Sequence, residues 1–427
     1  MLFLESFVHR HELAEVIRRW MVNRPEPGDV RRIKRVVNFN SYVARIWLDH
    51  VAGEVLTTLF GATPERLPIR TKGQLKDFVV DHLAYTNSRI EEICARYRKF
   101  PEDYYRETPI DGSYYVVDVG GTKRLVGTTR IKHFRRIAEK GARRIIDFML
   151  GRIRANADAL ADERARALGV PRNLLTTAPE EMVKEFAHAE RRLVKSIKGG
   201  TIQSGLPVLA IPDVAGLKVI IEDSEYDRLL EALRATGHCQ VLEAERHRGL
   251  YNAVNLRVAF TIPRNILASC PPTGRYLRIL AFRGFDPEKV AAEYQEFLRT
   301  AEDAVIVEVI VSTFQEYMES EIGRCMHEER VLSQRAHREY NSHVAMNVRW
   351  LMDYILGLCR GPGMPEVTDV PIKLWVKYMP DTIEHLMRSL YLSDDVFFDT
   401  MIEPPPTPVT TYSPRSAPPD PSVVTPE

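Results

Sequence analysis

One stretch decides how the middle of the chain is read: Ile211-Pro212-Asp213-Val214-Ala215-Gly216-Leu217-Lys218-Val219-Ile220-Ile221. An acidic residue and a glycine stand at the start of a run of β-branched and aliphatic residues, which is the composition of a buried strand. The glycine allows a substrate to approach the backbone, and Lys218 can offset the charge of a phosphate. The pattern therefore predicts that Asp213 holds a metal-bound phosphate at the edge of a sheet. The simpler alternative is that Asp213 only caps a turn before the strand.

A second carboxylate interrupts the apolar stretch Val305-Ile306-Val307-Glu308-Val309-Ile310-Val311-Ser312-Thr313. An unpaired carboxylate inside a protein costs several kcal/mol, so Glu308 either faces solvent or is compensated. A metal ion or a catalytic proton would provide that compensation. An outward position on an edge strand is the alternative.

Helical and extended patterns alternate around these two strands. Extended patterns cover six segments: residues 207–211, 216–221, 239–244, 253–261, 276–282 and 304–312. Helical periodicity marks residues 179–198 and 224–236, and it dominates the first hundred residues, where 73–100 read as a single helix. Residues 113–126 read as a hairpin that turns at Gly120-Gly121, because paired glycines accept the positive φ of such a turn. The sequence therefore predicts an α+β fold with a mixed sheet, flanked by helical N-terminal and C-terminal regions.

The same patterns divide the chain into segments. We expect a helical N-terminal region (1–112), a β-hairpin with a basic helical segment (113–179), an α+β domain (180–335), C-terminal helices (336–402) and a disordered tail (403–427). The tail contains nine prolines in 25 residues and few large apolar side chains, so it cannot bury enough surface to offset the cost of ordering.

Charge is balanced over the whole chain, with 59 Lys and Arg against 58 Asp and Glu. Residues 121–154 are the exception, because they hold eleven basic and two acidic residues. On a helix, Arg136, Lys140, Arg143 and Arg144 would share one face opposite an apolar face. This basic face predicts contact with RNA or a phosphorylated ligand, and an ordinary solvated surface is the alternative.

The sequence also points to a cellular location. Its five cysteines are scattered singly, without the paired spacing of a zinc site or a disulfide framework. The chain reaches Glu5 too early for a signal peptide, and no apolar run approaches the roughly 18 residues that span a bilayer. We therefore expect a cytoplasmic protein with reduced thiols and no membrane partner.

Three blocks follow one another in a definite order. They are Asp-Val-Ala-Gly-Leu-Lys from Asp213, His-Arg-Gly-Leu-Tyr-Asn-Ala-Val-Asn from His247, and Glu-Val-Ile-Val-Ser-Thr from Glu308 with Glu316, Glu319 and His327 after it. This order resembles the synthetase domain of the RelA/SpoT homologue family, which carries Asp-x-x-Gly-x-Arg, Gly-Tyr-x-Ser-x-His and Glu-x-Gln-x-Arg-Thr segments. The resemblance covers residues 185–335, roughly a third of the chain. Residues 1–180 show no histidine-aspartate hydrolase pattern, so the chain resembles a short, synthetase-only member.

The resemblance implies a nucleotidyltransferase-like domain that moves the β,γ-pyrophosphate of ATP onto a ribose 3′-hydroxyl. Asp213 would hold Mg²⁺, and Glu308 would complete the metal site or accept the proton of the attacking hydroxyl. The implied ATP-phosphate ligands are Arg192, Lys195, Ser196, Lys198 and Lys218. The implied acceptor ligands are His247, Arg248, Tyr251 and Asn255, with the Tyr251 ring stacked on the acceptor base.

Several positions depart from the family pattern. Lys218 replaces an arginine, Ala253 a serine, Asn255 a histidine, Ile310 a glutamine and Ser312 an arginine. An asparagine keeps a donor and an acceptor but cannot shuttle a proton, and a lysine keeps the charge but loses the bidentate fork. The acceptor stays open between a guanine nucleotide, which gives (p)ppGpp, and the 3′ end of tRNA, as in toxic small members. A catalytically degenerate nucleotide- or RNA-binding protein on the same fold is the alternative function.

Overall fold

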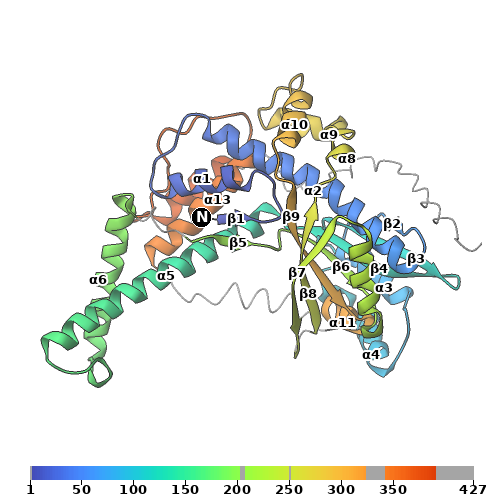
Figure 1. Ribbon diagram of the computed structural model, residues 1–427, viewed down its shortest axis with the longest axis horizontal. Coiled ribbons are helices and arrows are strands. Elements are labelled where there is room, and N and C mark those ends of the chain that lie inside the picture. Colours follow the sequence, from blue (N-terminus) through green and yellow to red (C-terminus); the bar gives the residue numbers. More distant parts are fainter. Residues whose placement is uncertain (1, 202–206, 250–251, 324–341, 391–427) are drawn as a thin grey trace, which may run out of the picture.

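A seven-stranded mixed sheet organises the described part of this computed structural model, which comprises residues 2–201, 207–249, 252–323 and 342–390 (Figure 1). In spatial order its strands are β2 (Glu65–Leu67), β3 (Gly112–Val119), β4 (Thr122–Ile131), β6 (Ala215–Ile220), β9 (Ala304–Ser312), β8 (Ala253–Thr261) and β7 (Cys239–His247). Only β6 and β9 run parallel within it. A separate parallel pair joins β1 (Leu2–Leu4) to β5 (Leu209–Ile211). The predicted α+β class with a mixed sheet is confirmed.

Some helices cover the sheet and others lie beside it (Figure 1). The helices are α1 (Arg10–Met21), α2 (Asp29–Phe60), α3 (Lys72–Asp81), α4 (Ser88–Lys99), α5 (Phe134–Ala167), α6 (Pro179–Lys198), α7 (Tyr226–Ala235), α8 (Arg264–Ala268), α9 (Gly274–Phe282), α10 (Val290–Arg299), α11 (Phe314–Met318), α13 (His343–Arg360) and α14 (Pro380–Leu390). A short π-helix, Glu319–Gly323, follows α11. Within the described residues, no helix has both the length and the apolar character needed to cross a bilayer.

The two faces of the sheet have different environments. Val305, Val307, Val309 and Val311 of β9 alternate onto one face and are buried in a core with α2, α7 and α10. Towards β3 and β4, the opposite face is covered by α3, α4 and α11 through a separate core. The remaining positions of β9 point to that opposite face, and Glu308 is among them, half-buried. Polar side chains therefore gather on one face of the sheet.

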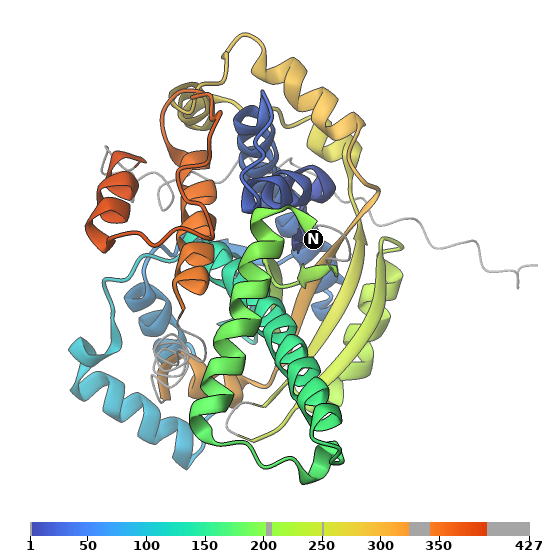
Figure 2. The same cartoon turned by 90° about the vertical axis from the view of Figure 1, so that its left-hand side faces the viewer.

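A third core unites the helices beside the sheet. It contains side chains of α1, α5, α6, α13 and α14. α6 packs against α5 at an angle, and Figures 1 and 2 show that the two helices form an arm that extends away from the sheet. The start of α5 stays close to the sheet, since β4 runs into it after only Lys132 and His133.

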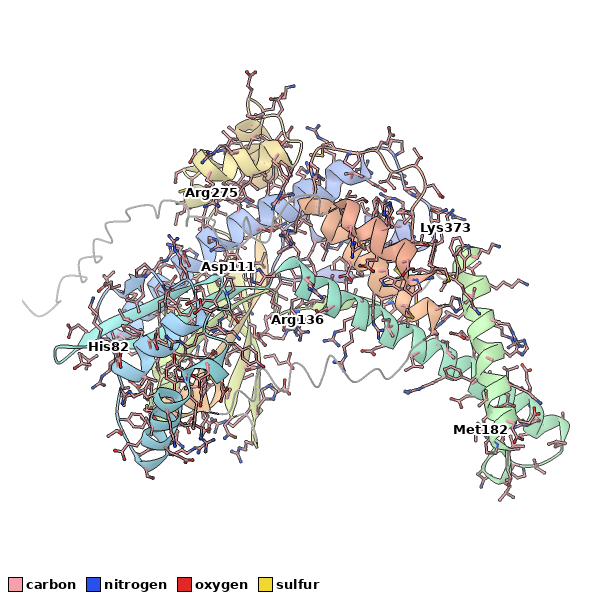
Figure 3. All side chains as sticks on the ribbon, turned by 180° about the vertical axis from the view of Figure 1, so that it is seen from behind. His82, Asp111, Arg136, Met182, Arg275 and Lys373 are labelled. Carbon is pink, nitrogen blue, oxygen red and sulfur yellow. The ribbon has the colours of Figure 1, made fainter. Side chains whose placement is uncertain are left out.

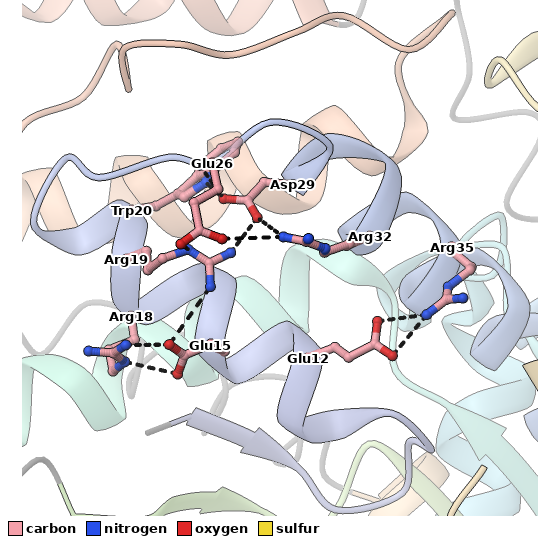
Figure 4. Close-up of polar contacts among 9 residues, drawn as sticks. All are labelled: Glu12, Glu15, Arg18, Arg19, Trp20, Glu26, Asp29, Arg32 and Arg35. Carbon is pink, nitrogen blue, oxygen red and sulfur yellow. Dashed lines mark hydrogen bonds and ion pairs between the residues drawn. The ribbon is translucent and has the colours of Figure 1, made fainter. Parts of the chain in front are cut away.

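The corner between α1 and α2 is held by one buried carboxylate (Figure 4). Asp29 is 1% exposed, and its Oδ2 accepts hydrogen bonds from the Trp20 indole nitrogen and the Glu26 backbone nitrogen, each at 2.9 Å. Its Oδ1 pairs with Arg19 and, at 3.1 Å, with Arg32. These bonds compensate the desolvation of a charge that would otherwise be costly to bury.

Several local predictions are confirmed. The hairpin turns at Gly120 and Gly121, whose φ angles are 63° and 81°. The predicted helix 179–198 is α6 with the same bounds, and the strand predicted at 304–312 is β9. The four cysteines within the described residues are free, as expected.

Two local predictions are wrong. Residues 276–282 form α9 rather than a strand, because Tyr276, Ile279 and Leu280 bury one helical face while their neighbours stay more exposed. Residues 73–100 form two helices, since Asn87 caps a new helix by accepting a hydrogen bond from the Ile90 backbone nitrogen at 2.9 Å. The tail 403–427 lies outside the described residues.

A half-buried aspartate on α13, which faces α5, is expected to make the stability depend on pH. Burial raises the pKa of Asp353 to about 6, with Arg135 opposing and Glu139 adding to the shift. Because the pKa of Asp353 is higher in the folded state than in the unfolded chain, its contribution to the free energy of unfolding is fully present below pH 4 and is lost as pH rises through 6. We expect Asp353→Asn to raise the free energy of unfolding by up to about 3 kcal/mol at pH 8 and to change it little at pH 4. Urea unfolding at both pH values measures this, and equal effects would contradict it.

Candidate functional site

Asp213 and Glu308 are brought together by the parallel pairing of β6 and β9. Gly216 is in register with Glu308, and Asp213 lies in the turn directly before β6. A Cβ atom added to Gly216 would lie 3.2 Å from the backbone oxygen of Glu308 and 4.0 Å from its Oε2. The Glu308 carboxylate therefore lies close to the backbone of Gly216, and a larger residue at position 216 would press against the backbone oxygen of Glu308.

Two lysines converge on Asp213. The Nζ atom of Lys132 lies 2.9 Å from Oδ2 of Asp213, and Nζ of Lys140 pairs with the same oxygen. The ammonium group of Lys132 also donates to the backbone oxygen of Asp213. The backbone nitrogen of Lys132 donates to the backbone oxygen of Val214 at 2.8 Å. Lys140 belongs to the basic face predicted to contact RNA, but in the structure its ammonium group pairs with Asp213. Lys132 is not among the predicted site residues, although it stands in the basic stretch at the end of a predicted strand.

The two carboxylates differ in their tendency to ionise. Burial opposes the charge of Asp213, but the charges and hydrogen bonds of Lys132 and Lys140 outweigh it and lower the pKa of Asp213. Burial raises the pKa of Glu308; the charge of Lys132 opposes this shift and that of Asp213 adds to it. Environments that push the pKa values of neighbouring acids apart are typical of acid–base sites.

Glu308 is poorly compensated by its immediate neighbours. Its cross-strand partner Arg257 is held instead by Glu5 at 2.9 Å and Glu243 at 3.0 Å. Asn255 approaches Oε1 of Glu308 with its side-chain nitrogen, at a long 3.4 Å. The Oδ1 atom of Asn255 is buried without a hydrogen-bond partner in the described part of the chain. Glu308 and Asn255 thus leave hydrogen-bonding capacity for a ligand.

The predicted acceptor ligands lie partly at this site. His247 ends β7 opposite Ala253, is about one-third exposed, and is close enough for its charge to influence the pKa of Glu308. Arg248 follows His247 directly in the chain. Tyr251 lies outside the described residues, so its predicted stacking on a base stays a prediction.

Lys218 shares this face of the sheet but serves a buried ion pair. Its Nζ lies 3.7 Å from Glu321 and 5.2 Å from the centre of the Tyr317 ring. Arg130 on β4 pairs with the same glutamate at 3.2 Å. Burial lowers the pKa of Lys218, and the charge of Glu321 opposes that shift. The structure thus places Lys218 beside α11, and its contact with a phosphate stays a prediction.

The other predicted phosphate ligands stand apart from the two carboxylates. Arg192, Lys195, Ser196 and Lys198 line a surface pocket at the C-terminal end of α6. Figure 1 shows α6 beyond α5, on the side away from the sheet. Among the described residues, no ion pair or hydrogen bond joins these four to Asp213 or Glu308. The structure therefore does not assemble one site from both predicted groups.

The remaining basic residues of α5 are placed between the sheet and the end of the arm. Figure 3 shows Arg136 at the start of α5 and Met182 on α6 towards the far end of the arm. Arg136 pairs with Glu139 at 2.7 Å, and Arg143 lies 3.9 Å from Asp147. Arg143 and Arg144 are exposed. Their contact with RNA stays a prediction.

The carboxylates fit the preferences of Mg²⁺. In nucleotide sites this ion is held by one or two carboxylates together with substrate phosphates and waters, so the two acids suffice. No cluster of three or more histidine, cysteine, aspartate or glutamate side chains that could hold a metal without a substrate occurs within the described ranges. The poorly compensated charge of Glu308 supports the fit, because a cation beside it would stabilise the ionised form.

Comparisons with known proteins give no relative from which to transfer a role. No protein-family model, no curated protein and no solved structure matches this chain. The function is therefore inferred from the geometry of Asp213, Glu308 and the lysines around them.

Proposed function

We propose that the protein is an ATP-dependent pyrophosphokinase with a nucleotidyltransferase-like domain. The observation that carries the proposal is the placement of Asp213, in the turn before β6, near Glu308 on the neighbouring strand β9, with their pKa values shifted in opposite directions and with lysines beside them. Phosphoryl-type transfer depends on positioning and on neutralising phosphate charge, and this face of the sheet offers both acids and cations.

The proposed reaction moves a pyrophosphate group. The oxygen of a ribose 3′-hydroxyl forms a bond to the β-phosphorus of ATP, and the bond from that phosphorus to the oxygen bridging the α-phosphate breaks. AMP leaves, and the Glu308 carboxylate takes the proton of the hydroxyl. A carboxylate with a raised pKa is better suited to this proton transfer than an ordinary glutamate, because its basicity is closer to the working pH.

Mg²⁺ would be held by Asp213 and Glu308, and it would supply charge neutralisation for the phosphates. Asp213 suits a metal ligand because its lowered pKa keeps it ionised at every physiological pH. ATP is the donor, and the acceptor is a guanine nucleotide or the 3′ end of tRNA. The exposed basic residues Arg143 and Arg144 support a polynucleotide acceptor.

The direct test supplies the donor with each acceptor. The purified full chain is incubated with ATP labelled at the γ-phosphate, Mg²⁺, and GDP, GTP or bulk tRNA. We expect label in one of these acceptors and an equal amount of AMP. Asp213→Asn serves as the inactive control. AMP or label that appears equally with Asp213→Asn would mean a contaminating enzyme, and no transfer to any acceptor would contradict the proposal.

A catalytically degenerate nucleotide- or RNA-binding protein is the second candidate. The observations that favour it are the separation of the α6 pocket from the two acids and the asparagine at position 255, which cannot shuttle a proton. This candidate predicts that ATP or tRNA binds without AMP release. Binding measured by calorimetry beside the transfer assay separates the two functions.

A further inference from the structure

The junction between β4 and α5 places two ammonium groups on one carboxylate oxygen. Lys132 follows β4 by one residue, and Lys140 lies in the second turn of α5. Both reach Oδ2 of Asp213, and within the described residues neither lysine forms another ion pair. Both positions lie outside the part of the chain that resembles the RelA/SpoT synthetases, so the resemblance assigns them no role.

The charges at this point do not balance. Two cations share one carboxylate, and within the described residues neither lysine forms an ion pair with the next carboxylate, Glu308. The lysine pair, Lys132 and Lys140, keeps 27% and 29% of its side-chain surface exposed, whereas Asp213 keeps 16%. Solvent and ligands can therefore reach the ammonium groups, and an added anion would complete the charge balance.

The backbone at both lysines is held in place by its neighbours. The backbone nitrogen of Lys132 is bonded to Val214, which precedes β6, and the pairing of β4 with β6 continues up to Ile131 and Ala215. Lys140 is held by α5, whose start packs through Phe134, Ile137 and Ala138 in the helical core. A lysine carries its ammonium group on a flexible four-carbon stem, so both side chains can turn from Asp213 to a ligand while the backbone stays in place.

We propose that Lys132 and Lys140 form a binding site for the polyphosphate of the donor, and that they rest on Asp213 until the donor binds. The lysines compete with a metal ion for Asp213 in the absence of nucleotide, because ammonium groups on Oδ2 repel a divalent cation. An incoming polyphosphate draws the ammonium groups towards itself and leaves Asp213 available. This inference rests on the proposed function for the identity of the donor, but its anion chemistry is independent of transfer.

Two titrations test the lysine pair. Tripolyphosphate and ATP are titrated into the full chain in EDTA, and Mn²⁺ is titrated without nucleotide and followed by its EPR signal. We expect Lys132→Met and Lys140→Met each to weaken polyphosphate binding about tenfold and to tighten Mn²⁺ binding severalfold. Lys132→Arg should keep most of the polyphosphate affinity, since the charge remains. Lys184→Met, at an exposed lysine on α6, is the matched control and should change neither titration.

The two affinities are expected to change in opposite directions, which separates a binding role from a merely structural one. Loss of a structural role would lower the melting temperature without weakening polyphosphate binding and tightening Mn²⁺ binding together. Polyphosphate affinity unchanged in both methionine variants, Mn²⁺ affinity unchanged in both, or no tripolyphosphate binding by the parent protein would each overturn the proposal. Lysine-dependent tripolyphosphate binding without any transfer would leave the site standing and reject the pyrophosphokinase. Transfer that persists at the parental rate and KM for ATP in both methionine variants would reject the lysine site and leave the pyrophosphokinase standing.

Discussion

Glu308→Gln is expected to abolish most of the transfer activity while leaving the fold intact. Glutamine has nearly the same shape but cannot accept the proton of the acceptor hydroxyl, and loss of a general base costs about 10²- to 10⁴-fold in rate. The variant should not unfold more easily, because it replaces a half-buried carboxylate that has a long contact to Asn255 and, among the described residues, no ion-pair partner. The rate of AMP release at saturating ATP measures the first effect, and urea unfolding measures the second.

A matched control uses an exposed glutamate on a helix away from the sheet. Glu296 on α10 forms an exposed pair with Arg299, so Glu296→Gln should leave both the rate and the unfolding midpoint unchanged. ATP affinity measured in EDTA should be nearly the same in Glu308→Gln as in the parent, since the proposed polyphosphate ligands are lysines and no metal then bridges Glu308 to the nucleotide. A Glu308→Gln variant that transfers pyrophosphate at more than a tenth of the parental rate would show that Glu308 is not the base.

Of the proposed substitutions, Lys34→Met is expected to lower the free energy of unfolding most. Lys34 is fully buried, and its ammonium group donates to the backbone oxygens of Arg283, Gly361 and Gly363 at 3.1, 2.7 and 2.6 Å. Burial lowers the pKa of Lys34 to about 8, so at pH 7 the group is mostly protonated and each of its three hydrogens has an acceptor.

Two of these acceptors lie at helix ends. Arg283 directly follows α9, and Gly361 directly follows α13, so one ammonium group satisfies carbonyls at both C-termini and complements their dipoles. Methionine fills similar space but takes the ammonium donor away from the buried carbonyls of Arg283 and Gly361 and from the partly buried carbonyl of Gly363. At about 1 to 3 kcal/mol for each unsatisfied group, the free energy of unfolding should fall by roughly 4 kcal/mol.

The shift of the urea midpoint at pH 7 measures this loss. Lys184→Met makes the same chemical change at an exposed position and should alter the free energy of unfolding by less than about 0.5 kcal/mol. If Lys34→Met and Lys184→Met unfold at the same urea concentration, the carbonyls are satisfied in another way and the capping role of Lys34 is refuted.

Local pattern was sufficient for much of the fold. The turn at Gly120-Gly121 needs positive φ at both residues, and α6 has a regular helical period with a proline at its start, so both were readable without tertiary contacts. Residues 276–282 were misread because a short apolar segment with β-branched and aromatic residues fits a strand as well as a helix. The packing of Tyr276, Ile279 and Leu280 settles that ambiguity only in the folded chain.

By itself the sequence determined the α+β class, the strands that carry Glu308 and follow Asp213, and the hairpin before the basic helix. Only the tertiary structure decided what surrounds the two acids. Lys132 and Lys140 meet Asp213 because β4 pairs with β6, although the two strands are separated by the whole arm in sequence. Lys34 reaches Arg283 and Gly361 across intervals of 249 and 327 residues. Ion pairs and caps of this kind depend on which backbones the cores bring together, and no local pattern encodes that choice.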